Sequence, residues 1–76
     1  MKENQINIHT TQKGFQKAKF LDALGRISSI EETVELGGKA SAWFGLDNGD
    51  RIRFDQETAK IAAPILAQFA ETGKIA

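Results

Sequence analysis

Apolar and polar side chains alternate on both sides of Asn48-Gly49, between residues 40 and 54. An Asn-Gly pair between two such segments is the strongest short-range signal for a β-hairpin. A two-residue loop would place Phe44 opposite Arg53, whereas a three-residue loop with its glycine in the left-handed conformation places Phe44 opposite Ile52. We favour the second register because it gathers the apolar side chains on one face of the hairpin.

The segment before this hairpin extends the same apolar face. Its apolar side chains share one parity: Ile30, Val34 and Leu36. A loop at residues 37–39 would place Leu36 opposite Ala40, so this segment would form a third strand beside the hairpin. Glu32 has the same parity and would point inward, so we expect a β-bulge between residues 28 and 33.

The N-terminal third admits two interpretations. A loop at residues 12–14 would pair Ile8 with Ala18 in a first hairpin. Alternatively, residues 15–24 form a helix that Gly25 ends. We favour the hairpin because Gly14 would weaken the first turn of such a helix.

The last segment predicts an amphipathic helix that begins after Asp55 and ends at Gly73. Asp55 is a good N-cap residue, and Gly73 suits the left-handed C-terminal position. Pro64 lies on the polar side, where we expect a kink rather than a break. The less polar half of the helical wheel contains Thr58, Ala59, Ile61, Ala62, Ile65, Leu66, Phe69 and Ala70.

These elements predict an α+β fold: an antiparallel β-meander of four or five strands with one C-terminal amphipathic helix packed on one face. Residues 1–76 suffice for a single small domain with a modest core. We expect the core to consist of Ile6, Ile8, Phe20, Ile30, Val34, Leu36, Phe44, Leu46, Ile52, Phe54, Ile61, Ile65, Leu66 and Phe69.

Composition narrows the classes of function. Ten basic and ten acidic side chains give a net charge of zero, which provides no general attraction to nucleic acid or to an anionic membrane. The absence of cysteine excludes disulfides and thiolate metal sites and fits a reducing compartment. No apolar run approaches the roughly 18 residues of a membrane span. We therefore expect a cytoplasmic protein.

Candidate catalytic and metal-binding residues are few. His9 is the only histidine, and no carboxylate lies near it at metal-ligand spacing. Glu31 and Glu32 would point to opposite faces of a strand and cannot act together. The glycines match no phosphate-binding or dinucleotide motif. The sequence thus predicts no enzyme, no cofactor and no metal site.

The candidate binding face is the sheet surface that carries Trp43 opposite Arg53. Its candidate ligand-binding residues are Trp43, Arg53, Arg51, Phe15, Lys17 and Lys19. Aromatic rings among basic groups on an open sheet are typical of single-stranded nucleic-acid binders. The alternative is a structural cation–π pair between Trp43 and Arg53, with Glu31 and Glu35 forming cross-strand salt bridges. A partly exposed tryptophan is also a common interface anchor.

From Phe15 to Phe69, the sequence predicts antiparallel strands followed by one helix that starts at Asp55-Gln56-Glu57. This order of elements resembles that of the PC4-, PUR- and Whirly-like proteins, which bind single-stranded nucleic acids. This resemblance implies single-stranded nucleic-acid binding as the alternative function. The leading hypothesis is a non-enzymatic protein-interaction module that forms a homodimer and acts through the sheet face that carries Trp43 or through a sheet edge, because small sheets with open edges associate readily.

Overall fold

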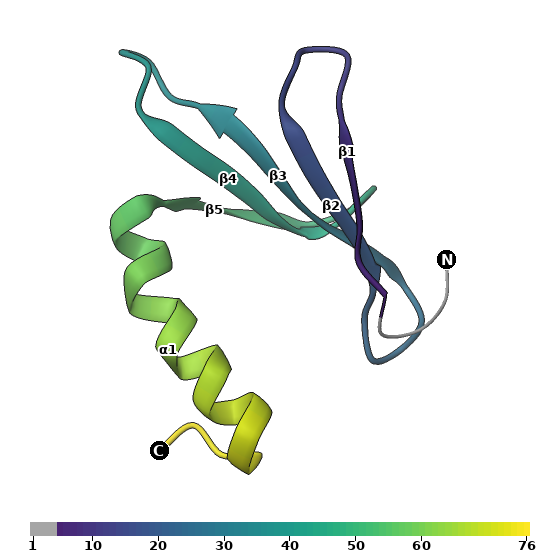
Figure 1. Cartoon of the computed structure of the whole chain (residues 1–76), viewed down its shortest axis with the longest axis vertical. Coiled ribbons are helices and arrows are strands. Elements are labelled where there is room, and N and C mark those ends of the chain that lie inside the picture. Colours follow the sequence, from purple (N-terminus) through teal and green to yellow (C-terminus); the bar gives the residue numbers. More distant parts are fainter. Residues whose placement is uncertain (1–4) are drawn as a thin grey trace.

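The computed structural model describes residues 5–76 and shows a five-stranded antiparallel sheet followed by one helix (Figure 1). Each strand pairs with the next along the chain, so the sheet is a simple meander. The fold class predicted from the sequence is therefore confirmed. The elements are β1 (Asn7–Thr10), β2 (Gln16–Leu21), β3 (Ile27–Val34), β4 (Ala40–Leu46), β5 (Arg51–Asp55) and α1 (Gln56–Thr72).

All four hairpin connections close with the same pair of backbone hydrogen bonds. In each turn, the N–H of the first residue donates to the carbonyl of the residue four positions later, as from Thr11 to Phe15. The carbonyl of the first residue accepts the N–H of the residue three positions later, which is a glycine in every turn: Gly14, Gly25, Gly38 and Gly49. The first three have positive φ, whereas Gly49 does not, so its expected left-handed conformation is wrong. The N–H of Asp47 in this last turn donates to the carbonyl of Ile27 (3.0 Å), which ties the turn to β3.

Two of the predicted hairpin registers are confirmed. Phe44 lies opposite Ile52 across β4 and β5, as the three-residue loop requires. Ile8 lies opposite Ala18 across β1 and β2, and β2 replaces the alternative helix at residues 15–24. The apolar side chains of the meander consequently share one face of the sheet.

The register predicted between β3 and β4 is wrong by two residues. Val34, rather than Leu36, lies opposite Ala40, because the three-residue loop consists of residues 36–38 instead of the expected 37–39 and is closed by Glu35 and Lys39. A shift of two residues leaves every side chain on its expected face. The expected bulge is also absent from β3, and the Glu32 carboxylate accepts the backbone N–H of Gln16 (2.6 Å). That hydrogen bond satisfies the polar group that the bulge was expected to turn outward.

The caps of α1 confirm the predicted ends of the helix. The Asp55 carboxylate accepts hydrogen bonds from the backbone N–H and the hydroxyl of Thr58, both at 2.8 Å. Gly73 has φ +74°, and its N–H donates to the carbonyl of Phe69 (2.8 Å). The helix is continuous through Pro64. Among residues 5–76, no helix has the length and apolar character that a membrane span requires.

The expected core is not buried. Phe20, Phe44 and Phe54 form a row of edge-to-face ring contacts, yet each ring stays half-buried. None of the fourteen residues predicted as core is buried: Ile6, Ile8, Phe20, Ile30, Val34, Leu36, Phe44, Leu46, Ile52, Phe54, Ile61, Ile65, Leu66 and Phe69.

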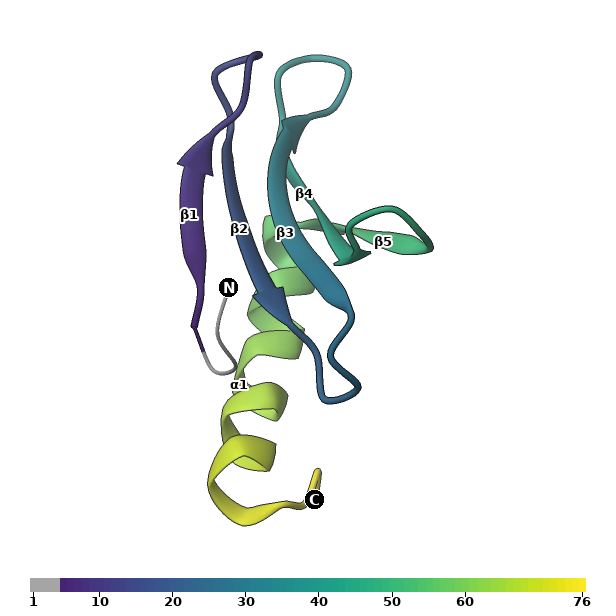
Figure 2. The same ribbon diagram turned by 90° about the vertical axis from the view of Figure 1, so that its right-hand side faces the viewer.

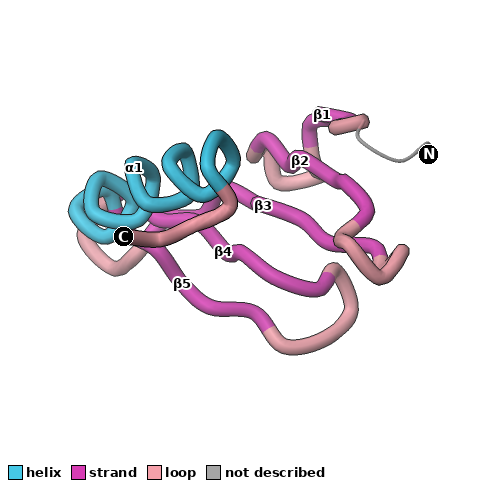
Figure 3. The backbone as a smooth tube through the Cα atoms, turned by 90° about the horizontal axis from the view of Figure 1, so that it is seen from below, coloured by secondary structure: helices cyan, strands magenta, loops and turns pink. Residues whose placement is uncertain are grey.

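Geometry explains why the core stays open. The helix lies on one side of the sheet and contacts it mainly at β5 (Figure 3). Five strands spaced about 4.8 Å apart are roughly 19 Å wide, whereas a helix with its side chains is about 10 Å wide. One helix therefore covers only part of this sheet.

Candidate functional site

Trp43 lies near the middle of the polar face of the sheet, which we call the Trp43 face. It pairs with Glu31 of β3 on one side and with Arg53 of β5 on the other. The guanidinium carbons of Arg53 and Arg51 lie 5.0 and 5.2 Å from the centroid of the tryptophan ring. Both distances are within the range of a cation–π interaction. The two arginines thus cover a half-buried ring.

Carboxylates neutralise these basic side chains. Glu31 accepts a hydrogen bond from Arg51 (3.1 Å) and lies 3.7 Å from the Lys17 amine. Glu35 lies 3.8 Å from Arg53. The predicted cross-strand salt bridges are therefore confirmed. Pairs of this partly exposed kind contribute little to stability individually, but they determine which charges a ligand would meet.

Asp47 has a role that its position in a turn did not reveal. Its carboxylate reaches across the sheet to the amines of Lys17 (2.6 Å) and Lys19 (3.3 Å), and its side chain is 11% exposed. The interaction with the Lys17 amine, reinforced by those with the Lys19 amine and the Ser29 hydroxyl, lowers the pKa of Asp47 to about 2. Ser29 is fully buried opposite Gly45.

The structure brings together most of the predicted binding residues. Lys17 and Arg51 both form ion pairs with Glu31, which lies opposite Trp43. Lys19 forms its ion pair with Asp47, which Lys17 also contacts. Phe15 lies apart from them, in the turn before β2, where its carbonyl accepts the N–H of Thr11 (2.7 Å). The Trp43 face is therefore an ion-pair network around one aromatic ring.

The opposite side of the sheet, together with α1, forms a second candidate surface, which we call the apolar face. Its sheet residues are Ile30, Ala42, Phe44, Ile52 and Phe54, and its helix residues are Ala59, Ala62, Ala63, Ile65 and Leu66. Many of these side chains are substantially exposed, including Ile52 (59%) and Leu66 (55%). Apolar surface of this extent is typical of an interaction site.

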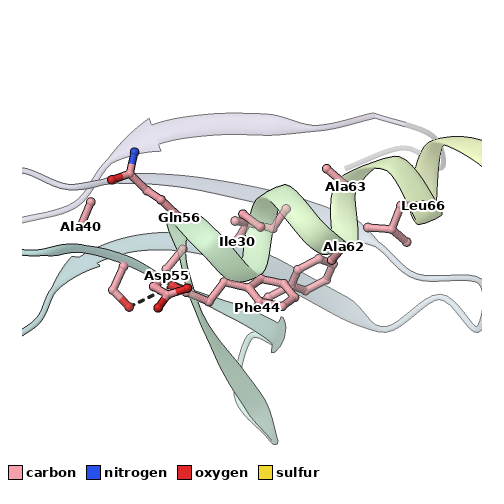
Figure 4. Close-up of a pocket in the computed structure, with 12 residues that line it drawn as sticks. Ile30, Ala40, Phe44, Asp55, Gln56, Ala62, Ala63 and Leu66 are labelled. Carbon is pink, nitrogen blue, oxygen red and sulfur yellow. Dashed lines mark hydrogen bonds between the residues drawn. The ribbon is translucent and has the colours of Figure 1, made fainter.

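A groove of about 300 Å³ opens between α1 and the sheet on this face (Figure 4). Phe44 and Ile30 line its sheet side, and Ala62, Ala63 and Leu66 line its helix side. A second groove of about 280 Å³ lies near Ile52 and Ile65. The sequence did not reveal these grooves because they depend on the angle at which the helix leaves β5.

Of the three polar side chains that line the larger groove, Ser41 and Asp55 have hydrogen-bond partners within the chain, and Gln56 is exposed. The Ser41 hydroxyl donates to the carbonyl of Phe54 (3.0 Å), and the Asp55 carboxylate caps α1 through Thr58. The hydrogen bond from the backbone N–H of Thr58 lowers the pKa of Asp55. The groove thus offers apolar contact rather than an acid, a base or a nucleophile.

His9 lies in β1 opposite Lys17, away from this groove. Within residues 5–76, no three His, Asp or Glu side chains are grouped so that they could hold a metal ion. The chain matches no protein-family model, no curated protein and no solved structure in the comparisons made. The Trp43 face and the apolar face are therefore the two candidate functional surfaces.

Proposed function

We propose that this protein is a non-enzymatic interaction module that self-associates as a homodimer through its apolar face. The observation that carries the proposal is that no apolar residue among residues 5–76 is buried. A folded domain normally encloses at least one apolar core. In the homodimer, the second copy would complete the core that one chain leaves open.

The accessible surface of the chain supports this proposal quantitatively. It measures 5990 Å², whereas a compact monomer of 8.3 kDa is expected to expose about 4,600 Å². The difference, about 1,400 Å², exceeds the roughly 800 Å² per partner of a standard interface. A second copy seated on the apolar face would remove surface of this order from water.

Helix α1 provides independent support. Sixteen of its 17 residues are exposed, with Ala62 as the half-buried exception. In proteins, most of the stability of a helix comes from packing of its amphipathic face rather than from helix propensity. A further surface against the apolar side of α1 would supply such packing.

A second copy is the occupant that the charges favour. The chain has a net charge of zero, so two copies do not repel each other overall. The Trp43 face, by contrast, presents ion pairs between its own side chains and would remain outside the dimer.

Sedimentation equilibrium of the wild type and two helix variants tests the proposal. We expect a wild-type dimer and a loss of dimer in Leu66→Glu, which places a charge on the apolar face. Gln68→Glu, on the polar side of the same helix, is the matched control and should dimerise normally. A folded wild-type monomer at micromolar concentration would refute the proposal. Loss of the dimer in Trp43→Ala, with Leu66→Glu unaffected, would move the interface to the Trp43 face.

Single-stranded nucleic-acid binding is the second candidate, favoured by the half-buried Trp43 ring between two guanidinium groups. A bound strand would have to compete with Glu31, Glu35 and Asp47 for the basic side chains, which is why we rank it second. Titration of labelled oligonucleotides at low salt tests it. The candidate fails if no salt-dependent binding is observed.

A further inference from the structure

We infer that the C-terminal half of α1 from one copy inserts into the groove between α1 and the sheet of the other copy, and that the exchange is reciprocal. This inference rests on the proposed homodimer and specifies which segment of the partner covers the apolar face. It follows from three features of the chain: a projecting helix end, a groove whose helix side is lined mainly by alanines, and the mainly apolar lining of that groove.

The C-terminal half of α1 extends beyond the sheet. In Figures 1 and 2, which differ by a quarter turn, the last turns of the helix run past the end of the strands. Ile65, near the start of this half, still lines the second groove together with Phe44 and Ile52 of the sheet, whereas Phe69 lines neither groove and is 53% exposed. A large apolar side chain such as Phe69, beyond the part of the helix that lines the grooves, is suited to insertion into an apolar recess of a second molecule.

The N-terminal half of α1 provides such a recess. Its groove-lining side chains are small, at Ala59, Ala62 and Ala63, so the space between helix and sheet remains open. Phe44 and Ile30 form the apolar floor of the groove, and Ile30 is still 37% exposed. Large side chains from a second helix can enter there without displacing a large side chain of this one.

The chemistry of the groove selects an apolar segment as its occupant. Nine of its twelve lining residues are apolar, and of the three polar ones Asp55 and Ser41 already have hydrogen-bond partners within the chain. A polar or charged ligand would lose its hydration against this apolar lining and could gain new hydrogen bonds only at the exposed Gln56 side chain. The C-terminal half of α1 is an apolar helical segment that every second copy supplies.

Two-fold symmetry makes the exchange self-consistent. In an isologous dimer, the same patch of each chain contacts the partner, so a projecting half and a receiving half on one helix satisfy both copies at once. Two α1 helices crossing near their midpoints would place each C-terminal half beside the N-terminal half of the other. The apolar surface of both chains would then be covered by one pair of helices.

Nuclear Overhauser effects measured on a mixed-label wild-type dimer test the inference. One copy carries labelled alanine and isoleucine methyl groups, and the other carries protonated phenylalanine in a deuterated background. We expect intermolecular effects from the Phe69 ring to the methyl groups of Ala63 and Ile30. The inference would be overturned if intermolecular effects were observed between other residues but none between Phe69 and Ala63.

A pair of helix variants provides a second, independent readout. Ala63→Phe fills the groove and should weaken dimerisation at least about tenfold, whereas Ala67→Phe, which lies outside the groove lining, should leave it unchanged. Circular dichroism verifies that both variants fold. Equal dimer affinities for the two folded variants would overturn the exchange while leaving homodimerisation intact. A wild-type monomer in sedimentation would instead refute the proposed function itself.

Discussion

Substitution of Asp47 by asparagine tests whether the turn after β4 is held to β2 by charge. The Asp47 carboxylate forms ion pairs with the amines of Lys17 (2.6 Å) and Lys19 (3.3 Å), and asparagine keeps its size while removing its charge. The pKa of Asp47 is lowered from the usual 3.8 to about 2, chiefly by its interaction with the Lys17 amine. Asp47→Asn should therefore destabilise the folded protein at neutral pH.

The lowered pKa of Asp47 gives the magnitude and the pH range of this effect. A fall from 3.8 to about 2 corresponds to about 2.4 kcal/mol of stabilisation. Because solvent screens a network at the sheet surface, we expect about 1 kcal/mol to be observed. The folded-state pKa is the lower one, so the stabilisation is complete above about pH 5 and is lost as the pH falls through 4 toward 2.

Urea unfolding at fixed protein concentration, followed between pH 2 and pH 7, measures this contribution. The difference in unfolding free energy between wild type and Asp47→Asn should be largest at pH 7 and vanish near pH 2. Asp50→Asn is the control, because among residues 5–76 the Asp50 side chain forms no ion pair. A difference that stays constant across the pH range would contradict the electrostatic explanation.

Three further substitutions probe the local geometry. At Gly45, an added Cβ would lie 2.5 Å from the carbonyl oxygen of Asp50, so Gly45→Ala should cost about 1–3 kcal/mol in urea unfolding. Gly49→Ala meets chiefly the Leu46 side chain, has no positive φ, and should cost less; equal losses would contradict the steric reason. Asp55→Ala removes the N-cap of α1 and should cost about 1 kcal/mol, whereas an unchanged unfolding free energy would show that the cap is dispensable.

The sequence predicted the elements and the faces of the sheet because both depend on local patterning. Alternation placed Phe44 with Ile52 and Trp43 with Arg53, and the structure confirms both pairs. The register error at Val34 arose from the position of a three-residue loop that contains two consecutive glycines, which lies at residues 36–38 rather than at the expected residues 37–39. The faces were nevertheless correct, since the error was an even number of residues.

The interactions that the sequence did not predict all depend on how elements approach each other in space. Asp47 satisfies the usual requirements of a turn residue, and nothing in its sequence neighbourhood indicates that two lysines of β2 lie within reach. Likewise, the apolar pattern identified Ile30, Ile52 and Leu66 as residues that require burial. It could not indicate that the helix of the same chain leaves them exposed.

The breadth of the apolar surface on α1 connects the sequence to the proposed dimer. At 100° per residue, the polar positions Gln56, Glu57, Lys60, Pro64, Gln68 and Glu71 occupy about a third of the wheel. About 240° therefore remains for alanine, threonine and larger apolar side chains, whereas a helix on a single sheet needs a stripe of little more than 100°. Ile61 lies in the excess, beyond the helix residues that line the grooves, and is 70% exposed. A helix whose apolar arc is twice as wide as one sheet can cover is suited to two packing surfaces, and the reciprocal exchange of α1 provides the second.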